Sequence, residues 1–270
     1  PPRSTLFPYT TLFRSLFKSF EAGAAAIRRL VQAEVPVAML RLSDGDESYF
    51  FGALQGLRHP PGKAMEVAEK GLAALGYGPG RCVLMVGLEG EHGHVRSSLA
   101  ATTLACTREG GLPVGAGPGK AWLKNRYAMP YLRDPMLDRG IGVDTLETST
   151  TWANLPRLYE AVRQGIASKL GTGAVLAHIS HSYEDGASLY FTFFFARDLG
   201  DELGQWRAIK KAASDAIAEN GGTISHHHGV GQDHVAWLPK EKGPLALEMI
   251  AAAKKQLDPK GVLNPGKLLP

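Results

Sequence analysis

The sequence has few cysteines, no long hydrophobic run and no cluster of positive charge. The only cysteines among its 270 residues are Cys82 and Cys106, too few for a disulfide framework and not at zinc-binding spacing. No apolar stretch reaches the roughly 20 residues of a membrane-spanning helix. The net charge of +4 suits a small anionic substrate, but without Lys/Arg runs a nucleic-acid partner is not expected. We therefore expect a cytoplasmic protein without a transmembrane segment.

Nucleotide-binding signatures are also missing. The chain contains no GxGxxG, no Walker A motif and no internal repeat. What remains is an ordinary globular composition, 44% hydrophobic and 21% charged, long enough for one large domain or two small ones.

Periodicity predicts an α+β fold with a largely antiparallel sheet covered by helices. Asp185-Gly186 lies between two strand-like runs and predicts a hairpin. Residues 112–119 are predicted to form a loop or an edge strand. The expected strands are 36–42, 82–88, 141–148, 174–183 and 187–196, and the expected helices are 17–31, 46–57, 64–75, 91–108, 121–133, 152–170, 203–219 and 244–257.

The first residues form a separate case. Thr5 to Ser15 (TLFPYTTLFRS) resembles the in-frame translation of a sequencing-adapter primer, and the segment has no clear period. We therefore expect residues 1–15 to be non-native and to have no fold. The native protein is then expected to begin upstream, with this chain as a C-terminal fragment.

The densest concentration of functional side chains is GGTISHHHGVG, residues 221–231. Thr223 to Ser225 is predicted to form a short strand, so His226 and His228 would share one face and His227 would take the other. The flanking glycines suit tight turns and close backbone approach to something flat or anionic. Because histidine carries protons near neutral pH and also binds metals, both roles remain open from the residues alone.

A second candidate is Tyr190 in the aromatic run LYFTFFF. Such a run is often plain core. Alternation, however, places Tyr190 on the same face as Thr192 and Phe194, beside a polar residue, and a buried phenol usually needs a hydrogen-bond partner.

Two arginines and a pair of histidines complete the candidates. Arg133 is predicted to end a helix, either as a solvated ion pair with Asp134 or as a bidentate phosphate clamp. Arg41 interrupts an apolar strand, so it faces either solvent or the active site. His178 and His181 are three apart on a predicted strand and should point to opposite faces; we expect His181 to line the cavity.

Several motifs together resemble a known family. They are GGTISHHHGVG, DGASLYF at 185–191, YLRD at 131–134 followed by Glu147-Thr148 and Trp152, and DPKGVLNPGK at 258–267. In this order, over roughly residues 37–269, the chain resembles the C-terminal half of FAD-linked oxidases of the vanillyl-alcohol oxidase type. The HHHG loop is similar to that of the alkyldihydroxyacetonephosphate (alkylglycerone-phosphate) synthase branch.

The resemblance implies an organisation and a cofactor. Residues 16–235 would form the cap (substrate) domain, and residues 236–270 would return to an FAD-binding domain of the same parent chain, which is absent here. FAD would be the cofactor, with Asn264 in the tail contacting it. The resemblance also allows a homodimer.

The resemblance implies a role for each candidate residue. Tyr190 would move the proton at the reacting carbon, and His226, His227 and His228 would orient substrate, stabilise charge and relay protons. The substrate phosphate would be bound by Arg133, with Arg41 and His181 nearby and Arg41 acting indirectly. Related 2-hydroxy-acid dehydrogenases carry a glutamate before the last histidine of this loop. Because His227 occupies that position here, we predict no metal.

Three functions follow, in order of preference. The first is an alkylglycerone-phosphate synthase-like exchange of the acyl group of acyl-dihydroxyacetone phosphate for a long-chain alcohol, a step of ether lipid synthesis, for which the fragment alone would be inactive. The alternative is an FAD-dependent oxidoreductase of a 2-hydroxy acid or alcohol. The third is a non-catalytic zinc- or ligand-binding domain, which bound metal would reveal and which the lack of accompanying Cys or carboxylate ligands disfavours.

Overall fold

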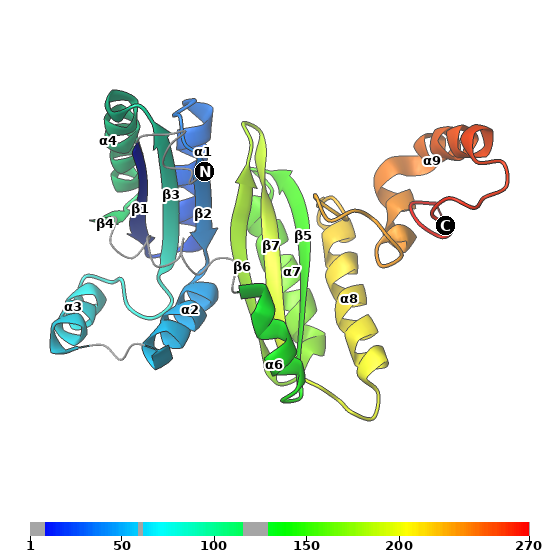
Figure 1. The fold of residues 1–270 in the computed structure, drawn as a ribbon, viewed down its shortest axis with the longest axis horizontal. Coiled ribbons are helices and arrows are strands. Elements are labelled where there is room, and N and C mark those ends of the chain that lie inside the picture. Colours follow the sequence, from blue (N-terminus) through cyan, green and yellow to red (C-terminus); the bar gives the residue numbers. More distant parts are fainter. Residues whose placement is uncertain (1–8, 59–61, 116–128, 270) are drawn as a thin grey trace. The chain divides into compact units, whose positions relative to one another are not determined.

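The computed structural model describes residues 9–58, 62–115 and 129–269, with strands that form an antiparallel sheet covered by helices (Figure 1). The hydrogen-bonded strand order is β4-β1-β3-β2-β6-β7-β5. The predicted α+β class is therefore confirmed. The strands are β1 (Tyr9–Phe17), β2 (Met39–Ser43), β3 (Cys82–Gly90), β4 (Leu112–Gly115), β5 (Ile141–Thr151), β6 (Gly173–Ser182) and β7 (Gly186–Ala196).

The helices follow the predicted periodicity closely. They are α1 (Phe20–Gln32), α2 (Gly45–Arg58), α3 (Lys63–Ala74), α4 (His92–Arg108), α6 (Arg133–Leu137), α7 (Leu155–Leu170), α8 (Glu202–Glu219) and α9 (Leu238–Leu257), with short 3-10 helices η2 (Met129–Leu132) and η3 (Val235–Trp237). Of the predicted helix 121–133, residues 121–128 lie outside the described part of the chain.

The chain divides into two compact units. The first contains residues 1–138 and 176–187, and the second contains 139–175 and 188–270. In the first unit β3 pairs antiparallel with β1 on one side and with β2 on the other. Helices α1 and α4 pack together and against these strands. The core of this unit consists of fully buried apolar side chains, among them Phe17, Ile27, Leu30, Leu42 and Leu84.

The prediction that residues 1–15 have no fold is wrong for residues 9–15. Strand β1 pairs with β3 along its whole length, from Tyr9 opposite Gly90 to Phe17 opposite Cys82. Leu12, Phe13 and residues 15–17 are buried. The segment is apolar enough to bury, and β3 satisfies its backbone hydrogen-bonding groups. Structure alone does not bear on the origin of the segment, so its adapter derivation stays a prediction.

The second unit contains the aromatic strand and the histidine stretch. Helices α7 and α8 pack against each other, and β5 and β7 are neighbours in the sheet. The aromatic side chains Phe191 and Phe193 are fully buried, as are Leu158 and Ile166 of α7. One face of β7 is therefore part of the core of this unit, and Tyr190 belongs to the same strand.

Helix α9 begins earlier than predicted and contains a kink. The expected start was residue 244, but the helix includes Leu238, and Gly243 breaks its regular geometry with φ 76° and ψ 166°. Pro244 follows directly, and a proline lacks the N–H that a continuous helix would need. The predicted segment is therefore the part after the kink. None of the described helices has the length and hydropathy required to cross a membrane.

Candidate active site

Tyr190 lies on the less buried face of β7, as predicted from alternation. Leu189, Phe191 and Phe193 are completely buried, whereas Tyr190 and Thr192 are intermediate. Successive side chains of a strand point to opposite faces, so the aromatic packing on one face fixes the direction of the phenol on the other. The strand thus holds Tyr190 away from the core it helps to build.

The Gly-Gly pair brings the histidine stretch onto β5. Gly221 has a φ of 68°, a conformation that favours glycine. A Cβ on Gly222 would lie 2.7 Å from Thr148 Oγ1 and 2.9 Å from a methyl of Leu158. The predicted close approach of the backbone therefore occurs at Gly222, but the neighbouring groups are Thr148 and Leu158 of this chain.

Residues 223–226 run alongside β5 without forming a strand of their own. The Thr223 amide donates to the Ser149 carbonyl at 3.0 Å, and the Thr148 hydroxyl donates to the Thr223 carbonyl at 2.7 Å. The His226 amide donates to the Glu147 carbonyl at 3.3 Å. The predicted short strand is thus replaced by an irregular segment anchored on three consecutive residues of β5.

His226 and His228 lie on one side, as predicted, because both face the Glu147 carboxylate, but His227 does not take the opposite side. His227 has a φ of 57°, and the His228 amide donates to the His226 carbonyl at 2.7 Å, so the chain reverses at His227. The His227 ring stacks on that of His226, with centroids 4.0 Å apart. The strand assumption was wrong because this tight turn breaks the period of two.

A carboxylate joins the first and third histidines. Glu147 is buried, and its Oε1 lies 3.3 Å from His226 Nδ1 while its Oε2 lies 3.4 Å from His228 Nε2. The His228 ring in turn packs edge-on against Tyr190, with centroids 5.3 Å apart at 80°. A carboxylate, an imidazole and a phenol are therefore in consecutive contact. The imidazole of His228 therefore lies between a carboxylate and an aromatic ring, an arrangement that orients it.

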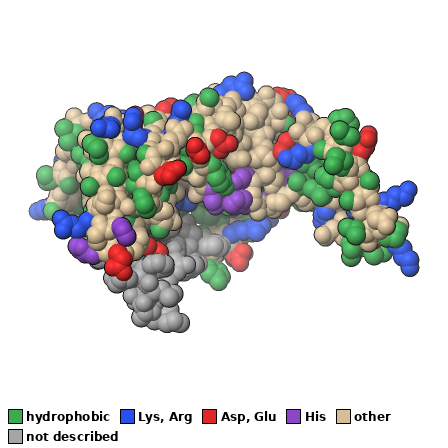
Figure 2. Space-filling view, turned by 90° about the horizontal axis from the view of Figure 1, so that it is seen from above, with side chains coloured by type: hydrophobic (Ala, Val, Ile, Leu, Met, Phe, Trp, Pro, Cys, Tyr) green, Lys and Arg blue, Asp and Glu red, His purple; other side chains and the backbone are tan. Residues whose placement is uncertain are grey.

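The site is accessible on one side. His227 and His228 are exposed, and histidine side chains are visible at the surface in the space-filling view (Figure 2). Beside His228 lies a cavity of about 550 Å³, whose other lining includes Lys210, His234 and Lys267. Burial and the neighbouring Lys210 lower the pKa of His234, so this imidazole is neutral at pH 7.

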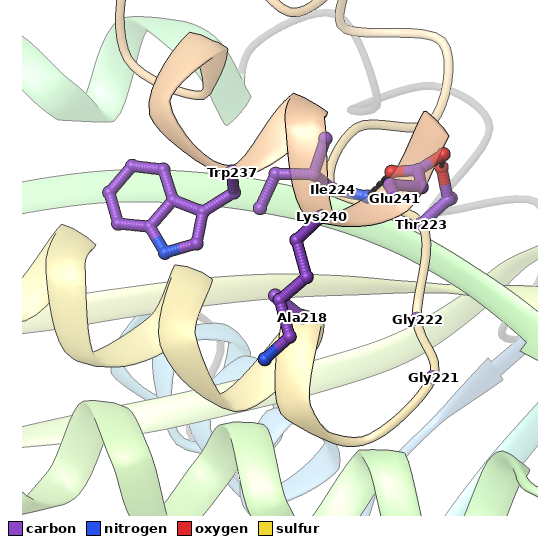
Figure 3. Close-up of a pocket in the computed structure, with 8 residues that line it drawn as sticks. All are labelled: Ala218, Gly221, Gly222, Thr223, Ile224, Trp237, Lys240 and Glu241. Atoms are coloured by element: carbon purple, nitrogen blue, oxygen red, sulfur yellow. Dashed lines mark hydrogen bonds between the residues drawn. The ribbon is translucent and has the colours of Figure 1, made fainter. Parts of the chain in front are cut away.

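Glu241 of α9 fastens the start of the histidine stretch. Its carboxylate accepts hydrogen bonds from the Thr223 hydroxyl at 2.9 Å and from the Ile224 amide at 2.7 Å, as the close-up shows (Figure 3). Burial alone would raise the pKa of Glu241, but the Ile224 amide and the neighbouring Lys242 outweigh it and hold that pKa below its usual value. The stretch is therefore anchored on both β5 and α9.

Arg41 belongs to a separate buried cluster in the first unit. Its guanidinium lies 3.0 Å from Glu47 Oε1 and 2.8 Å from His178 Nε2, and His178 Nδ1 lies 2.9 Å from the same carboxylate oxygen. Burial opposes ionisation of Glu47, but Arg41 and His178 prevail and lower its pKa. Arg41 thus has two defined partners, neither of them solvent.

The remaining candidate residues are Arg133, Asn264 and His181. Arg133 is exposed and begins α6, so the prediction that it ends a helix is wrong; Pro135 is tolerated because it lies in the first turn. Asn264 is exposed in the C-terminal tail, with a φ of 47°. His181 is exposed and His178 buried, as opposite faces require. Ligand binding by Arg133, His181 and Asn264 stays a prediction.

Sequence reasoning assigned no role to Glu147, Glu47 or His178. Glu147 contacts histidines some 80 residues further along the chain, a separation without a local pattern. A usable signal was present, because an acidic residue inside a predicted strand needs a partner wherever the strand is buried.

The chain was compared with known protein families and structures. A family model described as FAD linked oxidases, C-terminal domain, matches residues 8–268. The chain belongs to this family. The domain therefore contributes to a flavoprotein whose cofactor is FAD, as predicted.

The relatives found include alkyldihydroxyacetonephosphate synthases. That of Dictyostelium discoideum is 30% identical over 263 residues, and that of Trypanosoma brucei brucei is 30% identical over 262. Each match covers 94% of this chain and 43% of the relative, so the chain spans less than half the length of these proteins. A solved structure of alkyldihydroxyacetonephosphate synthase, 24% identical, covers 96% of this chain and 45% of that one with a TM-score of 0.74, which shows the fold.

The side chains of the second unit fit one side of a flavin site. Tyr190 and His228 offer a phenol and an imidazole at an accessible face, and Glu147 lies behind the imidazole. Bound FAD would supply the electrophilic ring system against which substrate reacts.

Proposed function

We propose that this chain is the substrate domain of an FAD-dependent alkylglycerone-phosphate synthase-like enzyme. The observation that carries the proposal is the contact series Glu147, His228 and Tyr190, formed around the histidine triplet. It occurs in a chain that is 30% identical to two such synthases over 94% of its length.

The reaction would replace an ester by an ether. The acyloxy group of acyl-dihydroxyacetone phosphate leaves as a fatty acid, and the oxygen of a long-chain alcohol takes its place on the same carbon. The alcohol proton ends on the released carboxylate or in solvent, so no electron acceptor is consumed. FAD, when bound, would supply the electron-accepting ring system that this exchange needs.

The residues of this chain would move protons and bind the phosphate. Tyr190 removes a proton at the reacting carbon and returns it, because its phenol lies on an accessible face beside His228. The imidazoles stabilise the phenolate when it forms. The substrate phosphate binds Arg133, whose exposed guanidinium is not occupied by an ion pair with another described residue.

The C-terminal residues would contact the FAD-binding domain of the parent protein. Helix α9 and the tail expose apolar side chains that a domain surface would cover, namely Leu245, Met249, Leu257, Val262 and Leu263. Asn264 lies in the same tail and would reach the cofactor from there.

The test uses the full-length parent protein purified with its flavin. It is incubated with acyl-dihydroxyacetone phosphate and a labelled fatty alcohol, and the lipid product is analysed. We expect an alkali-resistant ether product and release of the fatty acid, without lasting bleaching of the flavin. Bleaching by a 2-hydroxy acid without ether formation would identify the oxidoreductase instead and refute the proposal.

A further inference from the structure

We propose that Glu147 is the positioning residue of the histidine triplet, fixing which nitrogen of His226 and of His228 carries the proton. The inference rests on the proposed function for its consequence in catalysis, but its geometric part concerns this chain alone. Glu147 is 4% exposed and lies at the centre of β5.

The backbone and side chain of Glu147 act on the same loop. Its carbonyl accepts the His226 amide at 3.3 Å, and each carboxylate oxygen faces one imidazole, at 3.3 Å for His226 and 3.4 Å for His228. The turn at His227, with a φ of 57°, is what brings the first and third rings to one carboxylate. One buried residue thus holds both ends of the turn.

The contacting atoms define the tautomers. Neither contact has hydrogen-bond geometry, so both are ion-pair contacts; an ionised carboxylate attracts the N–H edge of a ring and repels its lone-pair edge, and therefore favours a hydrogen on each nitrogen that faces it. This assigns the proton of neutral His226 to Nδ1 and that of neutral His228 to Nε2. The opposite nitrogens, Nε2 of His226 and Nδ1 of His228, keep their lone pairs and can accept a proton during the reaction.

The orientation of His228 matters because its ring also packs against Tyr190, at 5.3 Å between centroids. A carboxylate behind an imidazole stabilises the imidazolium and prevents the ring from flipping, as in carboxylate–histidine pairs generally. Without Glu147, the ring would lose its preferred tautomer and its fixed edge toward the phenol. Only a fraction of the molecules would then have His228 in the tautomer and orientation that proton transfer requires.

The first experiment needs no substitution. Imidazole ¹⁵N shifts of the 270-residue chain, labelled at histidine, report the tautomer of each ring at a pH where the rings are neutral. We expect Nδ1–H for His226 and Nε2–H for His228. The ¹⁵N shifts of the exposed histidines His92 and His94 serve as the reference. Finding Nε2–H at His226, or Nδ1–H at His228, would overturn the proposal.

The second experiment compares Glu147→Gln and Glu147→Asp with Glu219→Gln, an exposed carboxylate outside the site, in the full-length flavoprotein. We expect Glu147→Gln to lower kcat roughly 10–100-fold with KM little changed, as is typical when a residue that orients a functional imidazole is removed. Glu147→Asp should recover part of that loss, and Glu219→Gln should have no effect.

The two experiments separate the possible failures. Correct tautomers with no ether-forming activity in the unsubstituted enzyme would refute the proposed function and leave the positioning role in place. Correct tautomers with full kcat in Glu147→Gln would refute the catalytic consequence. A Glu147→Gln protein that loses its circular dichroism spectrum would leave the tautomers of the unsubstituted chain to decide the proposal.

Discussion

At the scale of single residues, the functional side chains are held by buried carboxylates. Glu147 faces two imidazoles in the second unit, and Glu47 faces Arg41 and His178 in the first. Each carboxylate is nearly inaccessible, with side-chain exposure of 2%. A buried charge is tolerated only with partners, so these contacts fix the orientation of the groups around them.

Glu47→Gln should destabilise the first unit in a pH-dependent way. Arg41 and His178 lower the pKa of Glu47 in the folded chain, so its contribution is present above the unfolded value near 4.3 and is lost as pH falls through the lowered folded value. We expect a loss of about 2 kcal/mol at pH 7, less than for a fully buried pair because the Arg41 side chain is 21% exposed. Urea unfolding at pH 7 and at pH 3 measures it.

The matched control for this prediction is Glu66→Gln, because Glu66 is exposed on α3. The difference between the Glu47→Gln and control proteins should be large at pH 7 and shrink at pH 3, because pH 3 lies below the unfolded pKa near 4.3 and Glu47 of the unfolded chain is then largely protonated. Equal stabilities at pH 7 would mean that the cluster contributes no net free energy.

Residue-scale predictions from the sequence succeeded where the pattern is local. The faces of Tyr190 and of His178 and His181 follow from alternation along a single strand, and the structure confirms them. The contacts of Glu147 and Glu47 join distant segments and left no periodic trace. His227 was placed on the wrong face because a turn with positive φ replaced the assumed strand.

At the scale of elements, the histidine stretch is an irregular segment held from two sides. It is anchored on β5 through Thr148 and Ser149, and on α9 through Glu241. Because the stretch has no strand pairing of its own beyond these bonds, the anchors determine its conformation.

Glu241→Ala should loosen the stretch without unfolding the unit. It leaves the Ile224 amide without its acceptor, and Ile224 is only 2% exposed, so we expect a loss of about 1–2 kcal/mol. Amide hydrogen exchange should rise at 223–228 and stay unchanged in α7. Glu248→Ala, on the exposed face of the same helix, is the control. Unaltered exchange at Ile224 would contradict the anchoring role.

Element boundaries were predictable to within a few residues wherever helix or strand periodicity was strong. The hairpin at Asp185-Gly186 formed as expected, with the Tyr183 amide bonded to the Gly186 carbonyl at 2.8 Å. Strand β1 was not predicted, because the resemblance of residues 5–15 to an adapter sequence says nothing about folding, whereas the apolar side chains of Leu12 and Phe13 are buried in the sheet. Local hydrophobicity was the better guide there.

At the scale of the whole molecule, the chain corresponds to less than half of the synthases it resembles. The predicted division into residues 16–235 and 236–270 refers to the intact parent and stays a prediction, as do the homodimer and the cytoplasmic location. What the chain contributes by itself is a scaffold that presents Tyr190 and the histidines at an accessible face.

The isolated chain is expected to bind FAD weakly. The chain offers side chains to one side of the flavin ring system only, so most of the FAD surface would stay in water. The entropy lost when FAD is immobilised would then not be offset by contacts. Gel filtration of the chain with excess FAD, followed by absorbance at flavin wavelengths, measures retention. The full-length parent, run in parallel, should retain its flavin. Stoichiometric retention by the isolated chain would contradict this account.

The most direct measurement is ether formation by the full-length flavoprotein with and without the Tyr190 hydroxyl. Tyr190→Phe keeps the ring that packs against His228 and removes only the proton-transferring group. At equal flavin content, we expect the unsubstituted enzyme to form labelled ether lipid and Tyr190→Phe to lose at least about 100-fold in rate. Equal rates in the two proteins would contradict the central claim that this domain carries the proton-transfer step.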